Sequence, residues 1–362
     1  MNLNLTCVKN SMNGQDIYTC VKEPPSNQNV EHFGPSYNKN QEHIDAEFNT
    51  STSGSSATTL PTWGRYCDIT CVSKAILKSN PSHINASRSS SDQDKSSLSV
   101  KELEQMLIAA SGPISGCDSD GKDYTSIQDF WNSELNRWYK NAKEFWDDPE
   151  KCPITDDGVL QGYGKLTPID SKGSNAFLDK ILKMYPTLQF DRVADCGAGV
   201  GRVTKNLLLA RFNHVDLIEQ SARLSAATAK YIDAKPEDAK RITCIVQGLQ
   251  DFAPAPNTYD VIWIQWVIGY LHDLDTIRFF RRCAAGLKYN GLIVLKDNVS
   301  PPDYTFVVDK DDSSVARSPP YIKLLMQLAD LKIVMENLQT DFPAETIPVM
   351  MYAIAPIGRA EA

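Results

Sequence analysis

The sequence predicts an α/β fold, a doubly wound, mainly parallel sheet with helices on both faces. From about Asn175 onward, short apolar segments alternate with segments of helical periodicity. The apolar segments lack the polar alternation of a sheet with one exposed face, which indicates strands buried on both sides. Residues 1–99 are instead rich in Ser, Asn, Thr and Gln, which predicts a mostly disordered tail. We therefore expect this tail, a helical amino-terminal cap with a linker loop at 100–165, and the sheet domain at 166–362.

Composition narrows the classes of function. The 362 residues carry a formal net charge of -8 and no run of Lys or Arg, so a nucleic-acid partner is not expected. No segment has the roughly 18 uninterrupted apolar residues of a membrane-spanning helix, and the first residues do not resemble a signal peptide. Nine scattered cysteines indicate reduced thiols, and no His cluster accompanies the Cys67–Cys71 pair, so no metal site is expected. These features predict a soluble protein of the cytoplasm and nucleus, without a membrane partner.

The cap is predicted to contain two helices. The first covers 100–110, and the Gly- and Pro-containing stretch 111–125 is expected to be the linker loop. Ser126 and Asp129 have the spacing of a helix cap, and the aromatic-rich helix that follows extends to Trp146. Helical spacing places one apolar face on Phe130, Leu135, Trp138, Ala142 and Phe145. Two interpretations of the aromatic residues of this helix remain open: some of them face a ligand, or all of them fill the core. Within the tail, 69–77 is the one segment expected to form a short helix or strand.

The sheet domain is predicted element by element. The expected strands are 192–195, 214–218, 242–246, 259–264, 291–296, 332–336 and 349–354. The expected helices are 175–185, 204–211, 222–231, 275–287 and 320–328.

The strongest local signal lies after the first of these strands. Asp195 ends an apolar strand, and Gly197, Gly199 and Gly201 then lead into a helix. Glycines allow a sharp turn and a close approach of the backbone to a ligand. Glu219 ends the next strand, where a carboxylate can accept both ribose hydroxyls of an adenosine group. The alternative is an ordinary glycine turn in an α/β domain.

This order of strand, glycines, helix, strand and acid resembles motifs I and II of the class I S-adenosyl-L-methionine (AdoMet) methyltransferases, which have a Rossmann-like fold. The resemblance implies AdoMet as cofactor, with Arg202 facing its carboxylate and Leu249 and Gln250 beside its adenine. A dehydrogenase is a weaker interpretation, because the third glycine is misplaced for a dinucleotide fingerprint. Methylation of nucleobases is disfavoured, because Ile264-Gln265-Trp266-Val267 stands where those enzymes usually carry an Asn/Asp-Pro-Pro-aromatic clamp.

Several blocks resemble the eukaryotic α-N-terminal protein methyltransferases, which modify chains that begin X-Pro-Lys. The resemblance runs from about Trp138 to Ile354. Its blocks are Gly158-x-Leu-x-Gly-Tyr-Gly164, Asp195–Lys205, Gly248–Phe252, Tyr259–Gly269, Lys296-Asp-Asn298 and Asp312-Ser-Ser-Val-x-Arg317. Glu345 to Ala355 matches poorly, and no substrate contact is carried over from it.

The resemblance implies three groups of site residues. Those around the cofactor are Gly197, Arg202, Glu219, Gln220, Leu249, Gln250 and Gln265. Those around the substrate terminus are Trp146, Leu160, Trp266, Tyr270, Asn298, Asp309 and Ser314. The catalytic residues are Asp312, Asn298 and Asp309, with Asp312 or Asp309 as the main base. Tyr270 stands where some relatives have a His, so no imidazole base is expected there.

The chemistry of the substrate agrees with this assignment. An α-amino group has a pKa of about 7.7–8.0, and only its neutral form can attack a methyl group. The carboxylate of Asp312 can accept the departing proton, Trp266 offers a flat wall for a proline, and Asp309 can attract a lysine. The alternative for Asp312 and Asp309 is that each is a solvated charge on an open loop. The alternative for Trp266 is packing in the core. At the level of function, the rivals are a small-molecule methyltransferase and a non-catalytic adaptor of the same fold. The oligomeric state is left open.

Overall fold

The computed structural model describes residues 5–12, 15–22, 98–344 and 346–358, which fall into two units, 4–66 and the rest of the chain. In the smaller unit, strands β1 (Leu5–Met12) and β2 (Gln15–Lys22) form an antiparallel hairpin closed by the pair Met12 and Gln15. The expectation of a mostly disordered tail did not include this hairpin. Both strands carry β-branched residues at alternate positions, such as Ile17, Thr19 and Val21, and this signal was hidden by the Ser/Asn-rich average. The segment 69–77 lies outside the described residues.

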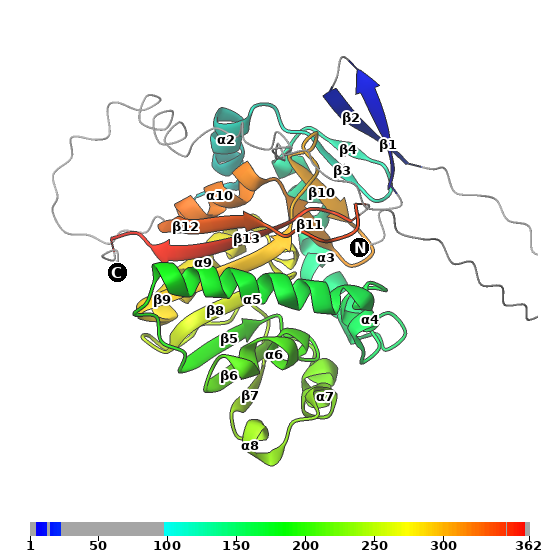
Figure 1. Cartoon of the computed structure of the whole chain (residues 1–362). Coiled ribbons are helices and arrows are strands. Elements are labelled where there is room, and N and C mark those ends of the chain that lie inside the picture. Colours follow the sequence, from blue (N-terminus) through cyan, green and yellow to red (C-terminus); the bar gives the residue numbers. More distant parts are fainter. Residues whose placement is uncertain (1–4, 13–14, 23–97, 345, 359–362) are drawn as a thin grey trace, which may run out of the picture. The chain divides into compact units, whose positions relative to one another are not determined.

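A seven-stranded sheet forms the centre of the larger unit (Figure 1). Its strands, in spatial order, are β12 (Leu331–Leu338), β13 (Val349–Pro356), β9 (Leu287–Asn298), β8 (Tyr259–Gln265), β5 (Arg192–Cys196), β6 (His214–Glu219) and β7 (Ile242–Val246). The five strands from β9 to β7 are parallel, whereas β13 is antiparallel to both of its neighbours. The predicted doubly wound, mainly parallel sheet is confirmed.

Helices cover both faces of this sheet, as predicted. Along β8, Val261 and Trp263 pack into one buried cluster, while Ile262 and Ile264 pack into another on the opposite face. Helix α5 (Thr167–Met184) contributes to the first cluster. The second receives side chains from α2 (Val100–Ser111), α3 (Ile127–Asp147), α9 (Asp273–Gly286) and α10 (Pro319–Leu328). Strands buried on both sides have no polar face, which explains the predominantly apolar sequence of the inner strands.

The remaining helices lie outside these two clusters or contribute little to them. They are α4 (Asp156–Val159), α6 (Arg202–Asn206), α7 (Ala222–Ile232) and α8 (Pro236–Ala239), with 3-10 turns at Gly164–Leu166, Leu208–Ala210 and Ile268–Tyr270. Helix α5 begins eight residues before the predicted 175. Pro168 stands at its start, where proline is favoured, but Ser171, Gly173 and Ser174 hide the helical pattern.

The predicted linker loop is wrong in part. Strands β3 (Gly116–Asp118) and β4 (Asp123–Tyr124) lie within it and join β10 (Phe306–Asp309) and β11 (Ser314–Arg317) in a second sheet of order β11-β10-β3-β4. The partner strands lie nearly two hundred residues further along, so no local pattern could reveal the pairing. The expected open loop at 309–314 is likewise the tight turn of the β10–β11 hairpin.

Helix α3 places most of its aromatic residues in the core. Phe130, Trp138, Ala142 and Phe145 are buried, as the apolar face predicted, and Trp131 is buried as well, but Leu135 is 41% exposed. Glu134 takes the buried position instead, and it pairs with Arg137 at 3.0 Å. Ser126 caps this helix by accepting a hydrogen bond from the Asp129 N–H. Helix α2 begins with a complete capping box between Ser99 and Glu102, so Ser99 belongs to the folded unit rather than to the tail.

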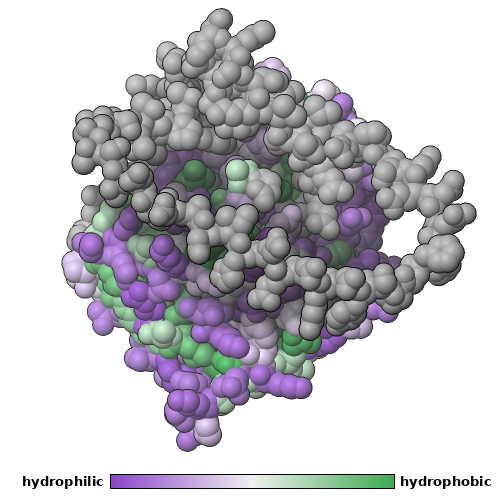
Figure 2. All heavy atoms as spheres, turned by 45° about the vertical axis from the view of Figure 1, so that its right-hand side comes forward, coloured by the Kyte–Doolittle hydropathy of each residue, from purple (hydrophilic) through white to green (hydrophobic). Residues whose placement is uncertain are grey.

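Within the described part of the chain, no helix is both long enough and apolar enough to span a membrane. On the face drawn in Figure 2, hydrophilic side chains are interspersed with smaller hydrophobic areas.

Candidate active site

The glycine turn after β5 forms one wall of the site. Gly197, Gly199 and Gly201 have φ of 68°, 56° and 89°, backbone angles that favour glycine. A Cβ at Gly197 would lie 2.3 Å from the Val267 side chain, so the turn also needs glycine for space. The turn leads directly into α6, which begins at Arg202. Asp195 is fully enclosed behind it and accepts a hydrogen bond from the Thr204 hydroxyl at 2.6 Å.

Glu219 holds this turn from the end of β6. One carboxylate oxygen accepts the Gly199 N–H and the other accepts the Ser221 N–H, both at 2.8 Å. Burial raises the pKa of Glu219, against the effect of these backbone donors. Each carboxylate oxygen can accept more than one hydrogen bond, so Glu219 keeps capacity for hydroxyl groups in the adjoining pocket.

A first pocket opens beside this turn and brings together all the residues predicted around the cofactor: Gly197, Arg202, Glu219, Gln220, Leu249, Gln250 and Gln265. Arg282 of α9 donates to the carbonyl oxygens of Leu249 and Gln250, at 3.0 and 2.9 Å, and so fixes that wall. Sequence reasoning missed Arg282, because its role depends on contact between a helix and a loop some thirty residues apart.

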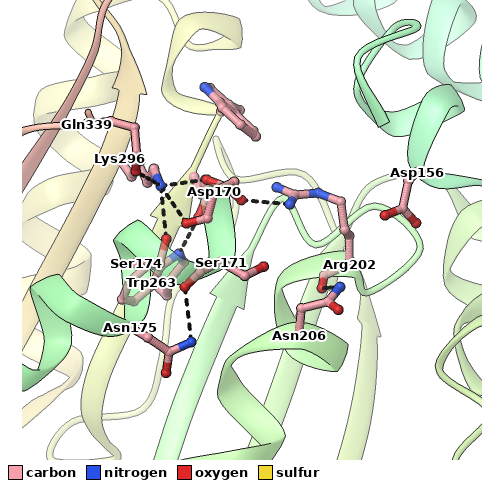
Figure 3. Close-up of polar contacts among 12 residues, drawn as sticks. Asp156, Asp170, Ser171, Ser174, Asn175, Arg202, Asn206, Trp263, Lys296 and Gln339 are labelled. Atoms are coloured by element: carbon pink, nitrogen blue, oxygen red, sulfur yellow. Dashed lines mark hydrogen bonds and ion pairs between the residues drawn. The ribbon is translucent and has the colours of Figure 1, made fainter. Parts of the chain in front are cut away.

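A buried charge cluster lies behind the pocket (Figure 3). Asp170 of α5 pairs with Arg202 at 2.7 Å and with Lys296 of β9 at 2.5 Å, and it also accepts the Gln265 amide at 2.9 Å. Burial alone would raise the pKa of Asp170, but Arg202 and Lys296 outweigh it and lower the pKa. Burial lowers the pKa of Lys296, and Asp170 opposes that shift. When Arg202 and Lys296 are both protonated, their two positive charges exceed the single negative charge of Asp170 by one.

The two ends of the pocket are chemically complementary to the two ends of AdoMet. Glu219, Leu249 and Gln250 provide acceptors and an apolar wall for an adenosine group. The Arg202 end carries the excess positive charge, which suits the carboxylate of an amino acid. The residues present therefore fit the cofactor. Asp170 and Lys296 were not among the predicted cofactor residues, and the signal for Lys296 was a lysine at the end of an apolar strand.

A second pocket shares Trp146, Val159, Leu160, Trp266 and Tyr270 with the first. Trp266 has a φ of 52°, uncommon for a bulky residue, and donates from its indole N–H to Asn298 at 3.1 Å. Asp297 accepts the N–H groups of Val267 and Ile268, both at 3.1 Å, and burial raises its pKa to about 7. Backbone strain of this kind clusters at functional sites, where surrounding contacts maintain it.

Asp312 reaches the second pocket from the turn of the β10–β11 hairpin. It is 3% exposed, and the Tyr270 hydroxyl donates to one of its oxygens at 2.7 Å. Among the described residues, its other oxygen and the Ser314 hydroxyl are buried and make no hydrogen bond of ordinary geometry, although the nearby Ser314 side chain favours the carboxylate and acts to lower its pKa. Burial, together with the charge of Asp309, raises the pKa of Asp312 to about 6. The alternative of a solvated charge on an open loop is therefore wrong for this carboxylate, because the hairpin encloses it.

Two predicted substrate residues do not line either pocket. Asp309 and Ser314 are both buried and form the strand pair that borders the turn of the hairpin, and Asp309 accepts the Asp311 N–H at 3.0 Å. In this structure Asp309 acts on the site through its charge, which raises the pKa of Asp312. A direct contact of either residue with substrate stays a prediction.

The segment between β12 and β13 completes the second pocket, although sequence reasoning assigned it no contact. Phe342, Thr346, Ile347 and Val349 line this pocket. The Phe342 ring stacks against Trp266, with ring centroids 6.4 Å apart and an interplanar angle of 28°. A hairpin loop far from any glycine or acid motif gave no signal, and only the fold brings it to the site.

Comparison with known proteins identifies the family. Residues 134–355 match the family model described as AdoMet dependent proline di-methyltransferase. The chain belongs to this family. It is therefore an AdoMet-dependent methyltransferase, and the predicted class I fold and AdoMet cofactor are confirmed.

The matches to relatives of this methyltransferase cover most of each relative's length. Alpha N-terminal protein methyltransferase 1 of Dictyostelium discoideum is 40% identical over 252 residues, which are 66% of this chain and 90% of that protein. N-terminal Xaa-Pro-Lys N-methyltransferase 1 of Rattus norvegicus is 39% identical over 60% of this chain and 95% of its own. A solved SAM-dependent methyltransferase from Leishmania major has a TM-score of 0.61 and 35% identity, covering 67% of this chain and 96% of that one.

Proposed function

We propose that this methyltransferase transfers methyl groups from AdoMet to the free α-amino group of proteins that begin X-Pro-Lys after removal of Met. The observation that carries the proposal is Asp312, which lies at a pocket that shares a wall with the cofactor pocket and has one buried oxygen without a hydrogen-bond partner among the described residues. The names of the relatives, which include N-terminal Xaa-Pro-Lys N-methyltransferase 1, support the same substrate. We further propose that the enzyme acts in the cytoplasm and nucleus and on protein partners rather than nucleic acid or membranes.

The two pockets separate cofactor from substrate. AdoMet supplies a methyl group on a positively charged sulfur. Trp266 and Tyr270 belong to both pockets, so a terminus held in the second pocket meets the cofactor between these two rings. A pyrrolidine ring in the second position of the substrate packs on a flat aromatic surface such as Trp266, and Leu160 and Trp146 shield this region from water.

Asp312 then acts as the general base. The α-amino group loses a proton to the unpartnered oxygen of Asp312, and its lone pair becomes available for attack on the methyl group. With a pKa of about 6, Asp312 lies below the amine by roughly 2 units, so the transfer costs about 3 kcal/mol. Tyr270 holds the other oxygen, which orients the carboxylate toward the pocket. Asn298, fixed by the Trp266 indole, would bind the substrate backbone.

Mass spectrometry of peptides tests the proposal. A peptide that begins Ser-Pro-Lys should gain one or more multiples of the mass of a methylene group when incubated with enzyme and AdoMet. The same peptide with an acetylated amino terminus, and one with Gln in place of Pro, serve as matched controls and should stay unmodified. Methylation of the acetylated peptide, or of small amines in preference to any peptide, would contradict the proposed substrate.

A further inference from the structure

The loop that completes the second pocket is anchored from inside the molecule. Gln339 directly follows β12, and its backbone N–H donates to Val349 at 2.9 Å, which closes the base of the loop. Its side chain is buried and turned inward, where it accepts a hydrogen bond from the Lys296 ammonium at 2.7 Å (Figure 3). Its amide also donates to the Thr340 carbonyl oxygen at 2.8 Å. One side chain therefore fixes the first residues of the loop to β9.

Helix α5 leaves space for this side chain. A Cβ at Gly173 would lie 2.1 Å from the Gln339 oxygen. Glycine inside a helix costs about 0.5–1 kcal/mol relative to alanine, so its presence in the middle of α5 needs a reason of this kind. The same Lys296 ammonium contacts Asp170 and the Ser174 hydroxyl of α5. Gln339 is thus a member of the charge cluster that also holds Arg202 at the cofactor pocket.

The loop carries the residues that face the peptide pocket. Three residues after Gln339, the Phe342 ring lies against Trp266 and extends the aromatic wall. The outer contacts between α5 and this region are weak by comparison. Lys180 reaches Asn337 at 3.4 Å and Lys172 reaches Asp341 at 3.9 Å, both on the surface. Exposed pairs of this type contribute little to stability.

We propose that Gln339 is a positioning residue for the substrate: through Lys296 it holds the loop so that Phe342 forms the second aromatic wall of the peptide pocket. This inference rests on the proposed function, since it assumes that the second pocket binds a peptide. Gln339 contacts neither pocket in this structure, so it acts only through the loop.

The substitution Gln339→Met tests this role, because methionine keeps the length of the side chain and removes both hydrogen bonds. The KM for a Ser-Pro-Lys peptide should rise about tenfold, while kcat and the Kd for AdoMet, measured by calorimetry, change less than twofold. Gln339→Glu restores an acceptor for Lys296 and should recover most of the loss. Asn337→Ala, which removes the surface contact between β12 and Lys180 of α5 two residues before Gln339, is the control and should behave as wild type.

A double-mutant cycle distinguishes positioning from a general structural effect. If Gln339 acts through Phe342, the changes in KM of Gln339→Met and Phe342→Ala will not multiply, since either one already displaces the wall. The inference would be overturned if the fold-changes in KM of the two single variants multiplied in the double variant. It would also be overturned if the KM of Gln339→Met equalled that of Asn337→Ala. Should Gln339→Met fail to fold, Gly173→Ala displaces the same amide and must raise the peptide KM for the inference to stand.

The wild-type measurement separates the two proposals. Absence of turnover on the peptide by wild type would overturn the proposed function and this inference with it. Wild-type turnover with an unchanged KM in the folded variants would overturn the inference alone.

Discussion

The two carboxylate oxygens of Asp312 differ in their hydrogen-bond partners. One is fixed by the Tyr270 hydroxyl, and the other is buried without a partner among the described residues. A buried acceptor without a partner destabilises a folded protein by about 1–3 kcal/mol. Such a cost is tolerated where a ligand supplies the missing donor, and the α-amino group of a substrate is a donor of the right kind.

Replacing Asp312 by Asn should lower the rate by about 10²–10⁴-fold, because the amide keeps the shape of the carboxylate and loses its basicity. The affinity for AdoMet should stay unchanged, and a higher pH should partly restore the rate by deprotonating the amine in solution. In wild type the rate should fall as the pH drops through about 6, because Asp312 then becomes protonated and cannot accept a proton. Peptide turnover between pH 5 and 9 measures both effects.

Asp311→Asn is the matched control, since Asp311 is the exposed acid next in sequence and lines neither pocket. Near-normal turnover of Asp312→Asn at neutral pH would assign the base to Asp309 or to water.

Replacing Glu219 by Gln should weaken AdoMet binding about 10- to 100-fold, equivalent to the roughly 1.5–3 kcal/mol of a hydrogen bond to a charged group. The amide would also direct its NH₂ group at the N–H of Gly199 or Ser221, which disturbs the glycine turn. Calorimetric titration with AdoMet measures the loss. Glu237→Gln, on an exposed position of α8, should bind like wild type. Equal affinities of the two folded variants would refute the role of Glu219.

The residues found from sequence and those missed differ in how they are positioned. Gly197 and Glu219 were predicted because a strand, a turn and the next strand place them in consecutive order along the chain. Asp170, Gln339 and Phe342 reach the site from α5 and from the β12–β13 loop. Their positions depend on packing between distant segments, which leaves no local pattern.

Among the elements, the parallel strands were predicted within a few residues because their sequences are predominantly apolar. The short strands β3 and β4 were not, since Gly116 and the neighbouring polar residues indicate a loop. In the structure that glycine is needed for packing, because a Cβ there would lie 2.4 Å from the Phe306 ring. The same residue that predicts a turn in sequence permits the pairing of β3 with β10.

The substitution Gly116→Ala should therefore destabilise the protein by about 1–3 kcal/mol, as expected for overpacking. In a flexible linker the same change would stabilise the chain slightly by reducing the freedom of the unfolded state. Urea unfolding distinguishes the two cases by the sign of the change. Asp123→Ala, at an exposed position of β4, is the control and should shift the midpoint little.

For the whole molecule, the proposed division at about residue 100 can be tested by truncation. A chain of residues 98–362 keeps Ser99 and its capping box and should fold, with turnover of short peptides within about twofold of the full chain. A chain beginning at Lys101 loses the cap and should be less stable by about 1 kcal/mol in thermal unfolding. Loss of turnover in the longer of the two would show that the preceding residues, including the β1–β2 hairpin, contribute to the site.

The position of β13 bears on biosynthesis. Among the described residues this strand comes last in chain order, yet it lies between β12 and β9 within the sheet. Until it emerges, β9 presents an unpaired edge, and the loop that carries Phe342 has no second strand to close it. Closure of this edge must therefore wait until β13 has been made. A stop codon between Leu338 and Val349 would yield a protein with an open sheet edge, which is a substrate for quality control.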